Sequence, residues 1–241
     1  MNEDLEQLLL NLKLKTIAAR FDEMLAAADQ NGTPVQTLVT QLLRAEWHAR
    51  QEKALQSRID RADFPEEWTL ESFPFKLQKG VKERQIRTFA ELDFIPKAEN
   101  IVFIGETGVG KTGLMISLAR KAVQNGYRAL FIKAQDLLDE MYASLADRST
   151  RRLLKSLANV DLLAIDELGY VNIKPEQTNI FFKLMEERYH RHSTIITSNL
   201  AYDEWRNFLG NQAMVDALLS RLRHYCHTVH INGPSLRDPQ G

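Results

Sequence analysis

A glycine-rich segment with one lysine is the part of this chain whose residue types and spacing most clearly predict chemistry. Residues 105–112 read Gly-Glu-Thr-Gly-Val-Gly-Lys-Thr and follow the apolar residues 101–104. This is the G-x-x-x-x-G-K-[ST] pattern of a phosphate loop, which joins a strand to a helix. Backbone N–H groups of such a loop enclose a β-phosphate, the lysine bridges the β- and γ-phosphates, and the Thr hydroxyl holds Mg²⁺. The predicted nucleotide contacts are Gly105, Glu106, Thr107, Gly108, Val109, Gly110, Lys111, Thr112 and Gly113.

Two adjacent acids, Asp166 and Glu167, end another apolar run. The carboxyl ends of parallel strands share one edge of a sheet, so these acids are expected beside the phosphate loop. We expect Asp166 to complete the Mg²⁺ shell through water and Glu167 to polarise the water that attacks ATP. Acids also cap helices at such positions, but the phosphate loop some 55 residues earlier favours the catalytic interpretation.

A third strand, over residues 194–198, ends in Ser198-Asn199. If this strand lies beside the acidic one, the Asn199 amide can orient the attacking water against the γ-phosphate. The alternative is an asparagine that begins a turn, as this residue commonly does.

Strands and helices alternate along most of the chain, which predicts an α/β fold with a parallel sheet of five strands flanked by helices. The strands are expected at 101–105, 129–133, 161–166, 194–198 and 227–231. The helices are expected at 3–30, about 34–61, 76–90, 111–125, 135–146, 149–158, 175–191, 203–209 and 212–223. Prolines and aromatic residues interrupt the pattern near 63–75. We therefore predict a helical N-terminal domain over 1–62 for partner or DNA docking, a linker over 63–75 and an ATPase domain over 76–241.

Composition excludes several classes of protein. The 241 residues are 44% hydrophobic and 26% charged with a net charge of −1, so any surface for a polyanion must be a local patch. No apolar run approaches the roughly 20 residues that span a bilayer. The single Cys226 and the acidic start of the chain, which lacks a signal-peptide pattern, predict a cytoplasmic protein without a membrane partner.

The combination of Gly-Lys-Thr, Asp-Glu and Ser-Asn resembles the AAA+ ATPases, and the whole chain is similar to the IstB-type helper ATPases of their DnaC/IstB branch. The matching segments are residues 12–14, 64–65, 69–73, 99–105, 165–170, 197–200 and 233–237. The resemblance implies an AAA+ P-loop fold without a C-terminal lid domain, with ATP and Mg²⁺ as ligands. It also implies a DNA-binding homo-oligomer that assists a cognate transposase in selecting and capturing target DNA during insertion-sequence transposition.

Further roles follow from the same resemblance. An arginine that reaches the ATP of the neighbouring subunit is implied, and Arg221 matches it best, with Arg223 second. The alternative for Arg221 is a surface residue on an amphipathic helix. Arg237 is the candidate to replace the sensor arginine of the missing lid. This chain has glycine at position 113, whereas other members of the branch often have histidine there.

Three basic clusters are candidates for DNA contacts. The first contains Lys76, Lys79, Lys82, Arg84 and Arg87; the second contains Arg148, Arg151, Arg152 and Lys155; the third contains Arg188, His190, Arg191 and His192. Few aromatic residues lie among them, so we expect backbone contacts of low sequence specificity. Each cluster alone is equally typical of a solvated helix face.

A metal site at Cys226 and its neighbouring histidines is rejected for lack of a complete ligand set. Trp47 and Trp205 are predicted to be packing residues.

Two alternative functions remain open. A replicative helicase loader of the DnaC type would use the same ATPase and a different client, with residues 1–62 deciding between them. A small-molecule P-loop kinase would act as a monomer, need a phosphate acceptor and lack salt-sensitive DNA binding.

Overall fold

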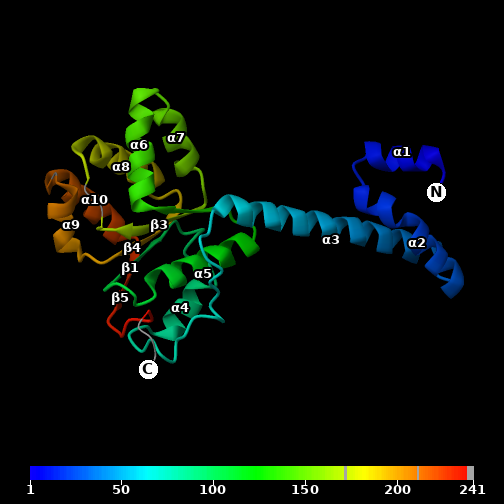
Figure 1. Ribbon diagram of the computed structural model, residues 1–241, viewed down its shortest axis with the longest axis horizontal. Helices are drawn as coiled ribbons and strands as arrows, with labels where there is room; N and C mark the ends of the chain where they lie inside the picture. Colours follow the sequence, from blue (N-terminus) through cyan, green and yellow to red (C-terminus); the bar gives the residue numbers. More distant parts are fainter. Residues whose placement is uncertain (171–172, 211, 238–241) are drawn as a thin grey trace. The chain divides into compact units, whose positions relative to one another are not determined.

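The computed structural model describes residues 1–170, 173–210 and 212–237. The chain divides into two compact units, residues 1–57 and 58–241 (Figure 1). This boundary lies inside the third helix, α3 (Val35–Ala62). Among the described residues, no helix is both long and apolar enough to cross a bilayer.

The first unit is helical, as predicted, but its first helix is interrupted. The structure has α1 (Glu3–Asn11) and α2 (Lys15–Asn31) in place of one helix over 3–30. Lys13 between them has a φ of 59°, which a right-handed helix cannot contain. The backbone N–H groups of Thr16 and Ile17 donate to the buried carboxylate of Glu46 on α3, at 2.8 and 3.2 Å. The apolar periodicity continues across the break, so it could not reveal where α2 begins.

The core of this unit contains Leu9, Ile17, Ala28, Leu38 and Leu42. Other apolar side chains of α3 are outside this core. Val35, Val39, Leu43 and Trp47 are exposed, and Trp47 keeps 57% of its accessible surface. Trp47 is therefore not the packing residue that its spacing predicted.

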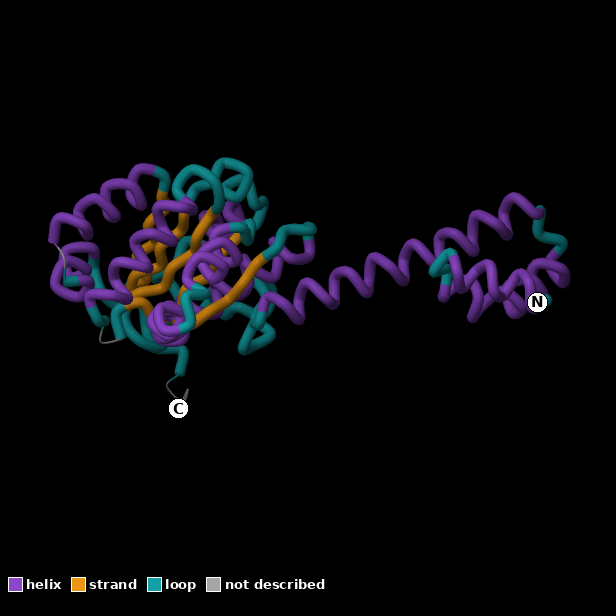
Figure 2. Tube along the Cα trace, turned by 90° about the horizontal axis from the view of Figure 1, so that it is seen from above, coloured by secondary structure: helices purple, strands orange, loops and turns teal. Residues whose placement is uncertain are grey.

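The second unit contains the predicted parallel five-stranded sheet (Figure 2). Its strands are β1 (Asn100–Gly105), β2 (Ala129–Lys133), β3 (Leu162–Leu168), β4 (Ser193–Ser198) and β5 (Cys226–Ile231), in the order β2-β3-β4-β1-β5. Every strand pairs in parallel with its neighbours. Because β1 and β3 flank β4, the ends of all three strands meet at one edge, where the phosphate loop and both acids also lie.

The helices of this unit follow the predicted order. They are α4 (Glu83–Phe89), α5 (Lys111–Gln124), α6 (Ala134–Ala146), α7 (Thr150–Ala158), α8 (Pro175–Arg188), α9 (Tyr202–Leu209) and α10 (Gln212–His224). The predicted helix over 76–90 is shorter, because residues 74–81 form turns. The buried side chain of Gln78 stabilises them by donating to the carbonyls of Val109 and Pro234, at 3.1 and 3.0 Å. Contacts between such distant segments leave no trace in local periodicity.

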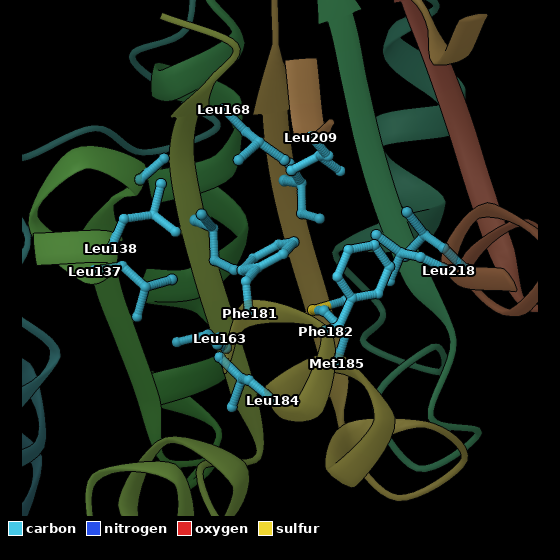
Figure 3. Close-up of a cluster of buried hydrophobic side chains, with 14 of the residues drawn as sticks. Leu137, Leu138, Leu163, Leu168, Phe181, Phe182, Leu184, Met185, Leu209 and Leu218 are labelled. Atoms are coloured by element: carbon cyan, nitrogen blue, oxygen red, sulfur yellow. The ribbon is translucent and has the colours of Figure 1, made fainter. Parts of the chain in front are cut away.

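A large apolar cluster fixes β3 and β4 against α6, α7, α8 and α10. Figure 3 shows Leu163 and Leu168 of β3 surrounded by leucines of α6 and by Phe181, Phe182 and Met185 of α8. Trp205 of α9 is completely buried in this cluster, as predicted for a packing residue. Burial on both faces explains why β3 begins with a continuous apolar run, residues 162–165.

Candidate nucleotide-binding site

The phosphate loop connects β1 to α5 and has the backbone that its glycines predict. Gly108 and Gly110 have φ values of 84° and 92°, which residues with a Cβ rarely adopt. The Nζ of Lys111 donates to the carbonyls of Gly105 and Glu106, at 2.8 and 2.7 Å. Burial lowers the pKa of Lys111, while the charges of Asp166 and Glu167 oppose that shift. A partly desolvated ammonium group inside this loop suits a phosphate anion.

Asp166 lies at the end of β3 with only 2% of its surface exposed. The hydroxyl of Thr112 donates toward both carboxylate oxygens, at 3.0 and 3.1 Å, and the hydroxyl of Thr197 donates to Oδ1. Burial raises the pKa of Asp166, and these two hydroxyl groups act in the opposite direction. The structure thus brings together the two residues predicted to hold Mg²⁺.

Glu167 is turned away from Asp166 by an irregularity in the sheet. The register between β3 and β4 shifts between Ile165 and Leu168, and Glu167 has a φ of 60°. Its backbone N–H donates to Thr197 Oγ1 at 2.9 Å, and its side chain is exposed. A bulge of this kind re-aims a side chain, and here it separates a buried acid from an accessible one.

Lys111, Thr112, Thr197 and Glu167 border a cavity of about 310 Å³. Its lining residues are Glu66, Trp68, Thr107, Gly108, Gly110, Lys111, Thr112, Gly113, Glu167, Tyr170, Thr197, Leu236 and Arg237. A concave site with a phosphate loop, a lysine and an exposed acid has the size and chemistry of a nucleotide pocket.

The segment after β5 supports the phosphate loop, which the sequence pattern of the loop did not indicate. The backbone N–H of Leu236 donates to the carbonyl of Gly108 at 2.8 Å. A Cβ on Gly108 would lie 2.5 Å from Ser235 Oγ, so the side chain of Ser235 occupies the space that a side chain at position 108 would need. This contact positions Arg237 at the cavity, where its charge contributes to lowering the pKa of Lys111.

Three further cavity residues were missed from the sequence. The hydroxyl of Tyr170 lies 2.5 Å from that of Thr107, which joins the loop after β3 to the phosphate loop. Trp68 and Glu66 come from the predicted linker. The prolines and aromatic residues near 63–75 predicted a linker, but they did not predict a position at the nucleotide site.

Asn199 and Arg221 do not line this cavity. The Oδ1 of Asn199 is buried without a hydrogen-bond partner, and a Cβ on Gly169 would lie 2.5 Å from it. Thr197, two residues earlier, is the polar residue of β4 that contacts the acids. Arg221 is exposed on α10, 3.8 Å from Glu186. The roles of Asn199 and Arg221 stay predictions.

Apart from Arg87, the residues of the first two basic clusters are our candidates for DNA contacts. They are all exposed: Lys76, Lys79, Lys82, Arg84, Arg148, Arg151, Arg152 and Lys155. Arg87 pairs with Glu83 at 2.6 Å. In the third cluster, the prediction for Arg188 is wrong. This residue is 1% exposed, and its guanidinium donates to the carbonyls of Leu157, Val160 and Ser193. It joins α7 to the sheet and is inaccessible to DNA.

The residues at the cavity fit a magnesium ion. Thr112 and Asp166 provide the oxygen donors that Mg²⁺ prefers, and few protein ligands are needed where phosphate and water supply the rest. Elsewhere in the described part of the chain, no group of three or more His, Cys, Asp or Glu side chains is placed to hold a metal ion.

Comparisons with known proteins give a consistent picture. A protein 33% identical over 234 residues, covering 97% of this chain and 88% of its own length, is named for ATP binding and for insertion sequence IS21 of Pseudomonas aeruginosa. Another, 31% identical over 237 residues and covering 98% and 94%, is named in the same way for IS5376 of Geobacillus stearothermophilus.

Solved structures show the same fold at lower identity. DnaI superposes with a TM-score of 0.60 at 20% identity, covering 69% of this chain and 92% of that one. The DnaC helicase loader gives 0.59 at 22% identity, covering 68% and 96%. AMPPCP-bound DnaA from Aquifex aeolicus gives 0.59 at 20% identity, covering 70% and 51%. The fold is thus that of AAA+ P-loop ATPases. Since the model of the family described as IstB-like ATP binding protein matches residues 7–240, this chain belongs to that family.

Proposed function

We propose that this protein is a magnesium-dependent, DNA-stimulated ATPase that assists a cognate transposase in selecting and capturing target DNA. The observation that carries the enzymatic part is the arrangement at the end of β3. Thr112 and Thr197 hold the buried Asp166, while Glu167 stays exposed at the same cavity as Lys111. One acid is positioned to hold a metal, and the other is accessible to water.

Each residue has a distinct task in hydrolysis. Lys111 exchanges its contacts with the Gly105 and Glu106 carbonyls for oxygens of the β- and γ-phosphates. Glu167 orients a water molecule and accepts its proton as the water oxygen bonds to the γ-phosphorus. The bond from that phosphorus to the bridging oxygen breaks, and ADP and phosphate leave. Thr112 and Asp166 would hold Mg²⁺, which supplies charge neutralisation at the phosphate oxygens.

Oligomerisation completes the site in this proposal. Arg221 lies outside the nucleotide cavity of its own chain, so it acts on the ATP of a neighbouring subunit. Arg237 borders the cavity in the same chain and contacts the γ-phosphate. Asn199 keeps its proposed role in water orientation only if it rotates from its contact with Gly169.

DNA binding is assigned to the exposed basic residues of the first two clusters, of which Arg151, Arg152 and Lys155 lie on α7. The names of the relatives support the connection with insertion sequences. Residues 1–62 are assigned to docking of the transposase or DNA, and the protein is placed in the cytoplasm.

The test is the ATPase rate as a function of protein concentration, with and without plasmid DNA. We expect a cooperative rise with concentration, enhanced by DNA, and its loss in Arg221→Ala. Arg206→Ala is the matched control, because Arg206 is an exposed arginine paired with Asp216 at 2.7 Å. An ATPase rate per protein molecule that is independent of protein concentration and of DNA would refute the assembly model.

The alternative function is that of a DnaC-type helicase loader, whose partner is a helicase in place of a transposase. It predicts that the protein captures a replicative helicase hexamer in a pull-down, whereas a transposition helper captures its transposase. The small-molecule kinase is not proposed, because the family model covers residues 7–240 and describes an ATP-binding protein of insertion sequences.

A further inference from the structure

The nucleotide cavity is lined by two chemically different sets of residues. Lys111, Thr112 and Glu167 suit phosphates and a metal ion. Trp68 and Glu66 come from a segment more than 35 residues before the phosphate loop. The charged and hydroxyl groups of the first set account for phosphate binding but not for the rest of a nucleotide.

The indole of Trp68 lies against Gly113, the residue that follows Thr112 in the first turn of α5. A Cβ on Gly113 would be 3.1 Å from Cδ2, 3.3 Å from Cε2 and 3.5 Å from Cε3 of the indole. These three distances show that the ring occupies the space beside Gly113 that a side chain would enter. A Cβ at position 113 would require the indole to shift by a few tenths of an ångström, so Trp68 and Gly113 form a complementary pair.

Two contacts hold the indole in this orientation. Its Nε1–H donates to the carboxylate of Glu66. Its ring centroid lies 6.3 Å from that of Phe73, with the planes inclined at 58°. The side chain remains half-buried and lines the cavity, so part of the indole borders the space beside the phosphate loop.

We propose that Trp68 is the platform on which the base of the bound nucleotide stacks, and that Gly113 creates the space for it. The inference rests on the proposed nucleotide site. Tyr170 also lines the cavity, but its hydroxyl is held by Thr107 on the phosphate loop. Trp68 instead lies against Gly113, directly after the two residues that are proposed to hold the phosphates and the metal ion. Base stacking on an aromatic ring accepts any base but favours the larger π face of purines.

The test compares ligands that have a base with one that lacks it. ATP, ADP and inorganic tripolyphosphate, each with Mg²⁺, are titrated into the full-length wild type and Trp68→Ala, and the dissociation constants are measured by calorimetry. We expect Trp68→Ala to weaken ATP and ADP binding by about 5-fold to about 150-fold, the range found for loss of a base–aromatic stack. Binding of tripolyphosphate should be unchanged within twofold.

Fluorescence gives a second readout that a purely structural tryptophan would not produce. We expect ADP, but not tripolyphosphate, to quench the emission of the wild type, and Trp68→Phe to remove that quenching. Trp47→Phe is the matched control, because Trp47 lies in the first unit and should leave the quenching intact. Gly113→Ala, whose methyl group displaces the indole in an otherwise helix-compatible position, should reduce the quenching while the protein stays folded.

The outcomes separate this inference from the function on which it rests. If the wild type binds ATP and Trp68→Ala binds it equally well, the platform is refuted and the nucleotide site stands. If Trp68→Ala weakens tripolyphosphate as much as ATP, the residue supports the fold of the loop and the platform is again refuted. If the wild type binds no nucleotide, the proposed function fails and the platform fails with it.

Discussion

The hydroxyl of Thr197 donates a hydrogen bond to Asp166 and accepts one from the backbone N–H of Glu167. One side chain of β4 thus contacts both neighbouring residues of β3. The contact keeps the Asp166 carboxylate directed at Thr112 and stabilises the bulge that exposes Glu167. The two acids differ in accessibility because of this bulge and this threonine.

Replacing Thr197 by valine tests this relationship. Valine keeps the shape but leaves the Glu167 N–H without its acceptor and Asp166 without one donor. A lost buried hydrogen bond costs roughly 1–3 kcal/mol, so we expect ATP hydrolysis to fall by about 10-fold or more. Thr197→Ser should retain most activity. The comparison variant is Asn199→Ala. A larger loss of ATP hydrolysis there than in Thr197→Val would show that Asn199, directly after β4, is more important for catalysis than Thr197.

The raised pKa of Asp166 predicts a pH-dependent effect on stability. Because burial raises this pKa above 3.8, the folded state binds the proton more tightly than the unfolded state. The protein therefore loses stability as the pH rises from about 3.8 through the raised pKa of Asp166. Above that pKa the carboxyl group is charged, and the full loss of stability is reached. Asp166→Asn removes the charge, so its melting temperature should exceed that of the wild type at pH 7. The difference in melting temperature between the variant and the wild type should shrink at acidic pH. A variant that is less stable than the wild type at pH 7 would contradict this prediction.

Lys111 and Glu167 are expected to fail in different ways. Lys111→Ala removes a phosphate contact and should weaken ATP binding itself. Glu167→Gln keeps the size of an exposed side chain but cannot accept a proton, so ATP should bind with near wild-type affinity while turnover falls by about 10²–10⁴-fold. Equilibrium binding and single-turnover hydrolysis separate the two effects. Equal losses of binding in both variants would contradict the assignment of separate tasks.

The sequence revealed those parts of the site that depend on local pattern. The glycine spacing predicted the phosphate loop, and the apolar run before Asp166 predicted a buried strand that ends in acids. The bulge that separates Asp166 from Glu167 has no sequence signature, since it depends on the pairing of β3 with β4. Contacts between distant residues, such as Leu236 with Gly108 or Trp68 with Gly113, were equally hidden. Charge alone also could not show that Arg188 is buried.

Arg188 should contribute to stability rather than to DNA affinity. Its guanidinium is the donor for Thr194 Oγ1 at 3.0 Å and for carbonyls at the end of α7 and the start of β4. Arg188→Met leaves these buried acceptors unpaired, and we expect a loss of about 3 kcal/mol or more in urea unfolding. Arg191→Met is the matched control on an exposed neighbour and should change stability by less than about 0.5 kcal/mol. If both variants lowered the free energy of unfolding equally, the structural role of Arg188 would be refuted.

The basic face of α7 predicts a specific change in the salt dependence of DNA binding. Arg151 and Lys155 are both exposed and one helical turn apart, so they can follow one stretch of phosphates. Each phosphate contact that is removed should reduce the slope of log K against log salt by about 0.9 for duplex DNA. We expect Arg151→Ala and Lys155→Ala each to lower the slope by about that amount, equally for unrelated sequences. Arg206→Ala removes the same charge elsewhere on the unit and should leave the slope unchanged. A slope that is the same for all three variants and the wild type would show that α7 does not contact DNA.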